Sequence, residues 1–375
     1  MNNSSSIQNR LSFIESLRGV AALSVLMYHL AYIPRPNLDA PVWMWKLVLV
    51  GGSGVTLFFV VSAFTLTMSM RLRSQEPQQL LGFYVRRFFR IVPLFYFWVA
   101  LTWLRDRAWF GVTQSLGTVI LSMSFLFNLF PGKETGFVWA SWTLGVEMLF
   151  YFFFPLIYYF VDDIWKSLGF FFLSLVVSSV FSYLAKSYLH LGDSIVSSFI
   201  DISFFHHLPA FAFGIFIYYA YERYIQNQSI SISWGVLILS IGLYGYSAMQ
   251  DGRLGAFLEI KHWQAVIYGA LVVGLSILPL GILVNRITSF YGEISYSVYL
   301  NHPSLVFALI PVYRYVYEMP IPLTVKYSLC FLLTLVLLTI ASYFTYHAVE
   351  KPGMRLGSWV LKKLRGMQLF ASAES

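Results

Sequence analysis

Charged residues are scarce in this 375-residue chain: only 11% of its residues are Asp, Glu, Lys or Arg, whereas 58% are hydrophobic. A soluble domain has about 25% charged residues, so the composition excludes an ordinary soluble protein and predicts an all-α, polytopic transmembrane bundle. The net charge of +8 would suggest nucleic acid as a partner of a soluble chain, but here the basic residues lie at the ends of apolar runs. That placement indicates membrane topology and contact with anionic lipids, and no nucleic-acid partner is expected.

Cysteine is almost absent as well. Cys330 stands alone, which excludes an intramolecular disulfide and any multi-cysteine metal or redox site. The sequence also has no G-x-S-x-G elbow, no P-loop and no H-E-x-x-H motif. We therefore expect no metal, and histidine is left as the natural general base, with glutamate or tyrosine in support.

Long apolar stretches are what the chain has in abundance. Stretches of about 17 residues or more predict ten spanning helices, near residues 13–33, 46–70, 88–104, 142–161, 167–188, 203–221, 232–249, 261–284, 295–317 and 325–347. A shorter apolar patch at 118–130 is expected to be re-entrant or interfacial; if it spans, the count becomes eleven and the termini separate.

The domain organisation follows from these runs. We expect a disordered start at 1–10, a single transmembrane domain at 11–353 and a basic tail at 354–375. The connector at 71–90 carries five arginines against one acid, Glu76. By the positive-inside rule this connector and, for ten helices, both termini are cytoplasmic. The final HAVEKP segment is expected to end the last helix as a charged cytoplasmic cap.

An arginine and a histidine interrupt the first apolar run on one helix face. Arg18 and His29 are eleven residues apart, which is three turns plus about 20° at about 100° per residue. An ionisable side chain inside a membrane helix is costly and by default indicates a functional site. The alternative is a histidine satisfied by hydrogen bonds within the bundle.

Arginines also cluster at the start of the third predicted helix, in FYVRRFFRIVP. Arg87 and Arg90 are three residues apart and share a face, and Arg86 is four residues from Arg90. Guanidinium groups bind phosphates through paired hydrogen bonds and charge. The cluster therefore suits a nucleotide-like donor; ordinary anchoring at the membrane surface is the alternative.

A buried carboxylate is predicted within the aromatic run SWTLGVEMLFYFFFP. Glu147 must be paired or protonated there. Its candidate partners are Arg18, His29 or a tyrosine, in a functional or a structural ion pair.

Polar residues recur at the start of the ninth predicted helix, where Tyr296 and His302 form a second candidate polar site. The pair His206–His207 has no carboxylate or cysteine at a metal-ligand spacing. We interpret that pair as interfacial and satisfied by hydrogen bonds.

Six segments in order resemble the membrane acyltransferase-3 family, bacterial inner-membrane proteins that O-acylate carbohydrates. FIESLRGVAALSVLMYH contributes Glu15, Arg18 and His29, and the others are GVTLFFVVSAF, RRFFRIVP, SWTLGVEMLFYFFFP, SYSVYLNHP and VEKP. Glu15 stands where Asp is usual, Thr56 where the family has an acid, and Ala63 where it has Gly. The resemblance is to bundle-only members, without a fused esterase-like domain.

The resemblance implies an O-acyltransferase of the bacterial inner membrane that moves an acyl group, most simply from cytoplasmic acetyl-CoA, to a hydroxyl of a surface or lipid-linked glycan. In this hypothesis acyl-CoA, the glycan and membrane lipids are the partners, and the oligomeric state is open. His29 acts as base or acyl relay, and Glu147 orients it or balances its charge. The remaining roles are donor binding by Arg18, Arg86, Arg87 and Arg90, and substrate contact or orientation by Glu15, Tyr296 and His302.

Two other activities fit the same residues. Buried histidine and glutamate also serve proton relays, so a transporter or flippase for a lipid-linked sugar or a proton-coupled solute is the alternative. Acylation of a small molecule, such as an antibiotic or a lipid, ranks third.

Overall fold

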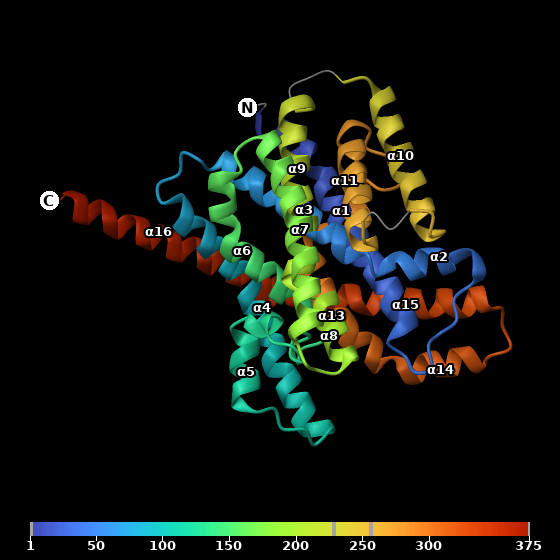
Figure 1. Cartoon of the computed structure of the whole chain (residues 1–375). Coiled ribbons are helices and arrows are strands. Elements are labelled where there is room, and N and C mark those ends of the chain that lie inside the picture. Colours follow the sequence, from blue (N-terminus) through green and yellow to red (C-terminus); the bar gives the residue numbers. More distant parts are fainter. Residues whose placement is uncertain (1–2, 227–229, 255–257, 374–375) are drawn as a thin grey trace.

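The computed structural model describes residues 3–226, 230–254 and 258–373, and these residues form helices with no β-strand among them. Within those ranges nine helical segments are long and apolar enough to cross a membrane, which confirms the predicted all-α transmembrane fold (Figure 1). Their main helices are α1 (Asn3–Tyr32), α3 (Gly54–Leu72), α4 (Gln79–Trp109), α6 (Trp142–Phe160), α7 (Ile164–Tyr188), α9 (Phe204–Tyr224), α10 (Ile232–Gln250), α11 (Ile260–Ile277) and α15 (Leu323–Thr345).

The ninth predicted span, 295–317, is divided into two short helices, α13 (Ser295–Ala308) and α14 (Ile310–Glu318). At about 1.5 Å per residue they are about 21 and 14 Å long, so neither alone crosses a hydrocarbon core of about 30 Å. The break has a local cause, since Pro311 lies in the first turn of α14. Proline has no backbone N–H for the carbonyl four residues earlier and its ring clashes with that carbonyl, which interrupts a continuous helix.

The patch at 118–130 contains only α5 (Leu116–Met123) and a single 3₁₀ turn (Leu126–Leu129). Eight residues of helix extend about 12 Å, so this segment does not span as a helix. The predicted helix at 46–70 is likewise divided, into α2 (Val42–Gly51) and α3.

Both ends of the described chain are helical. α1 begins at Asn3, so most of the segment 1–10 that we expected to be disordered is helix; residues 1–2 lie outside the described residues. At the other end the last spanning helix, α15, does not give way to a loop at Pro352, where the sequence predicts its end. It continues through a π-helical turn (Tyr346–Glu350) into α16 (Lys351–Ala373), and together they form the long orange-to-red rod in Figure 1. Residues 374–375 of the predicted tail lie outside the described residues.

Glycines allow the helix that carries Arg18 and His29 to pack tightly. A Cβ on Gly19 would lie 2.0 Å from the carbonyl oxygen of Thr288 in α12 (Arg286–Glu293), and one on Gly51 would lie 2.2 Å from that of Ser24. Only glycine fits such close approaches. The glycine of the Leu-Arg-Gly motif therefore has a packing role that positions α1 against α12.

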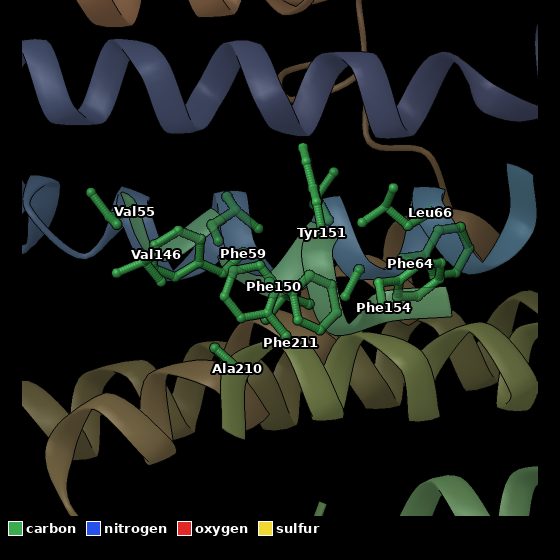
Figure 2. Packing of buried hydrophobic residues seen from close by; sticks show 14 of the residues in the cluster. Val55, Phe59, Phe64, Leu66, Val146, Phe150, Tyr151, Phe154, Ala210 and Phe211 are labelled. Atoms are coloured by element: carbon green, nitrogen blue, oxygen red, sulfur yellow. The ribbon is translucent and has the colours of Figure 1, made fainter. Parts of the chain in front are cut away.

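An aromatic core joins α3, α6 and α9. Phe150 of α6 stacks on Phe211 of α9 with ring centroids 4.0 Å apart, and Phe211 also stacks on Phe59 of α3 at 4.6 Å (Figure 2). Tyr151, the next residue on α6, points away from this stack toward α1. The core therefore orients one side of α6 toward the polar residues of α1.

Candidate active site

A cavity of about 70 Å³ gathers polar side chains from α1, α3, α4, α6 and α13. We call it the arginine cavity, because Arg18, Arg87 and Arg90 line it together with Ser62, Thr65, Thr143, Glu147, Tyr151, Ser295, Tyr296, Tyr299 and the apolar residues Val55, Phe58, Phe59, Ile91 and Leu144. Three of the four arginines predicted to bind the donor therefore meet, although Arg18 is about 70 residues from the other two along the chain. The buried Ser295 hydroxyl has no hydrogen-bond partner here, so the cavity also offers an unused polar group.

Glu147 is held within the arginine cavity. Its Oε1 atom accepts hydrogen bonds from the Ser62 hydroxyl at 2.8 Å and from the Tyr151 hydroxyl. The guanidinium of Arg87 lies over the ring of Tyr151, 5.6 Å from its centroid, and Glu147 is an electrostatic neighbour of Arg18. Of the partners predicted for Glu147, the structure supplies Arg18 and a tyrosine. His29 faces a different cavity, so the predicted contact between Glu147 and His29 is not made.

His29 lines a second cavity of about 570 Å³, the histidine cavity. His29 Nδ1 lies 2.9 Å from Nε2 of His302, and the two ring centroids are 4.8 Å apart. His302 is only 1% exposed. The remaining lining residues are Tyr28, Leu49, Val50, Gly52, Ser53, Val55, Trp142, Met249, Gln250, Ile260, Gln264 and Tyr299.

The hydrogen bonds of His302 determine which nitrogen of each ring carries the proton. The ring of His302 also bonds to the backbone of Val298 and Tyr299, and since Nε2 faces His29, Nδ1 is the nitrogen that can donate to those carbonyls. In that tautomer His302 Nε2 accepts and Nδ1 of His29 donates, and the ring of His29 also bonds to the backbone of Val25. This arrangement leaves Nε2 of His29 as an unprotonated base.

Position 302 is fixed by its neighbour Asn301. The Asn301 amide donates to the hydroxyls of Ser342 at 3.2 Å and Thr345 at 2.9 Å, and its carbonyl accepts from the Trp98 indole at 2.9 Å. These bonds join α13 to α15 and α4. The second histidine is thus held by a buried polar network and not by apolar packing alone.

The two cavities share a wall. Val55 and Tyr299 line both of them, and the Tyr299 hydroxyl accepts a hydrogen bond from Thr143 at 3.0 Å. Arg18 and His29 lie on one face of α1, about 16 Å apart along its axis. The geometry therefore places the arginine cavity and the His29 imidazole on the two sides of a wall that contains Val55 and Tyr299.

Comparison with known proteins shows the family of this chain. A family model described as an acyltransferase domain matches residues 11–351. The chain belongs to the acyltransferase-3 family. It is also 26% identical over 298 residues to the protein named “Putative acetyltransferase ORF330” of Acidianus two-tailed virus, an alignment that covers 77% of this chain and 81% of the viral protein. No solved structure matches.

Family membership establishes that the chain is a multi-pass membrane acyltransferase, and the transporter or flippase alternative is set aside. One position at which this chain departs from the pattern of the acyltransferase-3 family is part of the helix packing. Thr56, where the family has an acid, is buried and donates a hydrogen bond to Gln264 Oε1 at 3.0 Å. This residue lines neither cavity.

Arg86 does not share the arginine cavity. Its guanidinium pairs with Glu76 at 3.0 Å, and the same carboxylate also pairs with Arg73 at 3.2 Å and with Arg365 of α16 at 2.9 Å. Burial raises the pKa of Glu76, but the Arg365 hydrogen bond and the Arg86 and Arg73 charges outweigh burial and lower it. The prediction grouped Arg86 with Arg87 and Arg90, but Arg86 lies outside the arginine cavity, where Glu76 pairs with it and with Arg365 of α16.

Glu15 and Tyr296 occupy supporting positions. Glu15 is exposed, and the strongest charge acting on it is that of Arg18, in line with an orienting role. The Tyr296 hydroxyl donates to the backbone carbonyl of Ile91 at 2.7 Å. Tyr296 therefore joins α13 to α4 at the arginine cavity and lies apart from His302.

Glu350, predicted to be part of a charged cap, is instead 1% exposed. Its Oε2 accepts from the Ser297 hydroxyl at 2.9 Å, its Oε1 has no hydrogen-bond partner, and Arg90 and Arg18 are the cations that act on it. The π-helical turn that ends at Glu350 explains the difference, because it lets the helix continue past Pro352 and keeps the carboxylate inside. Such turns are frequent at functional sites.

Proposed function

We propose that this acyltransferase moves an acyl group, most simply acetyl, from acetyl-CoA to a hydroxyl of a surface or lipid-linked glycan. The observation that supports the proposal is the pairing of an arginine-rich cavity with an imidazole base across the wall formed by Val55 and Tyr299. An acyl-CoA donor is a polyanion with one reactive thioester, whereas a sugar acceptor is neutral and rich in hydroxyls. The two cavities differ in the same way, because the arginine cavity is lined by charged side chains and the histidine cavity by neutral polar and apolar ones.

The phosphate end of the donor would lie at the arginine cavity, whose volume of about 70 Å³ suits a phosphate-sized group and not a whole CoA molecule. Arg18, Arg87 and Arg90 supply guanidinium groups for its phosphates. Glu147 and Glu350 partly balance the charge of these arginines.

The acceptor would enter the histidine cavity, where Nε2 of His29 removes the proton from its hydroxyl. The alkoxide oxygen attacks the thioester carbonyl carbon, so a C–O bond forms as the C–S bond breaks. The CoA thiolate leaves and receives the proton. His302 accepts the Nδ1–H bond throughout and stabilises the imidazolium that forms on His29.

The proposed orientation places the arginine cavity toward the cytoplasm of a bacterial cell and the histidine cavity toward the opposite face of the inner membrane. It rests on the five arginines of the connector 71–90. Acyl-CoA is made in the cytoplasm and surface glycans are presented outside it. A path across the partition would therefore connect the two substrates.

The test is mass spectrometry of surface glycans from cells that have or lack this gene, with His29→Ala as the inactive variant. We expect the wild-type gene to add the mass of one acetyl group per repeat and the variant to add none. Unchanged glycan mass, with acetylation appearing on a small molecule or a free lipid, would overturn the glycan acceptor. Donor consumption in purified protein that is specific for another activated acyl carrier would overturn acetyl-CoA.

A further inference from the structure

A cluster of side chains outside both cavities joins the beginnings of α9 and α11. His206, Glu259 and His262 each present one ligand atom, and these atoms lie within 4.8 Å of one another. His206 is the third residue of α9 and His262 the third of α11, while Glu259 is the residue before α11. The carboxylate that was missing from the sequence around His206–His207 is thus supplied by a residue 53 positions away.

We propose that His206, Glu259 and His262 bind a divalent transition-metal ion of the Zn²⁺ class. Two imidazoles and one carboxylate are a common ligand set for zinc with a fourth position open to water. His206 Nε2 lies 3.4 Å from Glu259 Oε2. Two ligands about 2.0–2.1 Å from a tetrahedral ion are about 3.4 Å apart, so this pair already has a suitable spacing.

The histidines are buried but incompletely satisfied without a ligand. His206 and His262 are each 4% exposed, and Nδ1 of His206 is buried with no hydrogen-bond partner. Nε2 is the nitrogen that faces Glu259, so it is the atom that an ion would bind. Nδ1 then carries the proton of the His206 ring.

The surroundings of His262 resemble the support that metal-binding histidines receive. Its ring bonds to the backbone of His206, and its Nε2 lies 3.4 Å from the Ser178 hydroxyl of α7. Metal-ligating histidines usually donate their other N–H to a carbonyl or carboxylate, which fixes the ring. Glu259 is 52% exposed, so it can turn toward an ion and leave the fourth position open to water.

Lys261 is a nearby cation that would compete with the ion for the Glu259 carboxylate, but Lys261 is paired with Asp201. The Lys261 ammonium donates to the Asp201 backbone carbonyl and lies 3.2 Å from its carboxylate. The cluster therefore keeps a carboxylate of its own in Glu259. Among the residues that the structure describes, that carboxylate has a contact of 3.4 Å to Nε2 of His206.

A bound ion would fix one wall of the histidine cavity. Ile260 and Gln264 of α11 line that cavity, and His262 stands between them in the sequence. His207, next to His206, packs on Trp142 of the same cavity with ring centroids 5.3 Å apart. The ion would act as a structural tie between α9 and α11 and is not part of the acyl transfer.

The experiment is isothermal titration of Zn²⁺ into full-length, chelator-treated protein in detergent, with Co²⁺ absorption as a second measure of coordination. Glu259→Gln removes the carboxylate at a half-exposed position, and His262→Ala removes one imidazole. His190→Ala, which removes an exposed histidine, is the matched control.

We expect one Zn²⁺ per chain, binding weakened at least tenfold by Glu259→Gln and by His262→Ala, and no change in His190→Ala. Zn²⁺ should raise the melting temperature of the wild type and of His190→Ala, but not that of the two ligand variants. The proposal is overturned if the wild type shows no saturable binding, or if Glu259→Gln binds Zn²⁺ as tightly as the wild type. Because Glu259 is half-exposed, that variant remains informative even where His262→Ala does not fold. The titration uses neither donor nor acceptor, so its outcome is independent of the proposed acyl transfer.

Discussion

The arginine cavity and the histidine cavity lie side by side but have opposite electrostatic character. The first is lined by three arginines and a glutamate, whereas the residues described around the second include no Asp, Glu, Lys or Arg. Charge is thus concentrated on one side of the wall formed by Val55 and Tyr299. A neutral imidazole on the other side keeps its free lone pair, because no nearby carboxylate favours its protonation.

The largest effect is expected from removal of the base. His29→Ala should lower kcat by about 10² to 10⁴-fold, the usual contribution of general-base catalysis, while the Km for donor stays near its original value. The measurement is acyl transfer by purified protein at saturating acyl-CoA, with the exposed His347→Ala as the control. Wild-type turnover in His29→Ala would show that the histidine cavity is not the catalytic one.

Removal of one charge from the arginine cavity should affect binding instead of turnover. Arg87→Ala should raise the Km for acyl-CoA by about 10- to 100-fold, since a hydrogen bond to a charged group contributes about 1.5–3 kcal/mol. The matched control is its neighbour, Arg86→Ala, which removes a guanidinium held by Glu76 outside the cavity. Equal increases in Km for the two variants would contradict the division between them.

The distinction between Arg86 and Arg87 was not predictable from the helix pattern. Arg86 and Arg87 lie four and three residues from Arg90, and both spacings place side chains on one face. Glu76 decides the outcome, because it draws Arg86 toward α16. The fold class and the face shared by Arg18 and His29 follow from composition and periodicity, which are local properties.

Long-range contacts are what the sequence did not specify. His29 and His302 are 273 residues apart, and nothing in either local pattern predicts that their rings meet. Glu147 was placed in the aromatic helix, but its contact with Ser62 and Tyr151 depends on how α3 packs against α6. The prediction that Glu350 belongs to a charged cap is wrong, because the sequence HAVEKP carries no clear signature of the π-helical turn that buries this side chain.

His302 should act as a positioning residue for His29. His302→Ala should lower kcat about tenfold through loss of one hydrogen bond to the imidazole, with little change in either Km. His302→Gln can still offer an acceptor and should recover part of the loss. Parallel kinetics of the two variants separate this role from a purely structural one, which would lower the amount of folded protein without a difference in kcat between Gln and Ala.

A smaller effect is expected from the neutral polar lining of the histidine cavity. Gln250 lines it; its side chain approaches the Tyr246 hydroxyl, and its amide nitrogen has N–H groups to offer a second partner. A sugar hydroxyl could accept from this nitrogen, so Gln250→Leu should raise the Km for the acceptor about 2- to 10-fold and leave the Km for acyl-CoA unchanged. A change in the donor Km alone would place the acceptor elsewhere.

The smallest effect is expected on stability, from the carboxylate of Glu76, which lies outside both cavities. The pKa of Glu76 is lowered in the folded protein, so its contribution to stability is present above its ordinary value of 4.5 and is lost as the pH falls below that value through the folded-state pKa. Because the side chains of this network are about 26–41% exposed, each pair should contribute at most about 1 kcal/mol. Melting temperatures in detergent between pH 6 and pH 3 should therefore fall slightly more for the wild type than for Glu76→Gln, which cannot titrate there. The same loss of melting temperature in both proteins would assign the acid sensitivity to other carboxylates. A change in the Km of Glu76→Gln for acyl-CoA at neutral pH would show that this network is coupled to the arginine cavity.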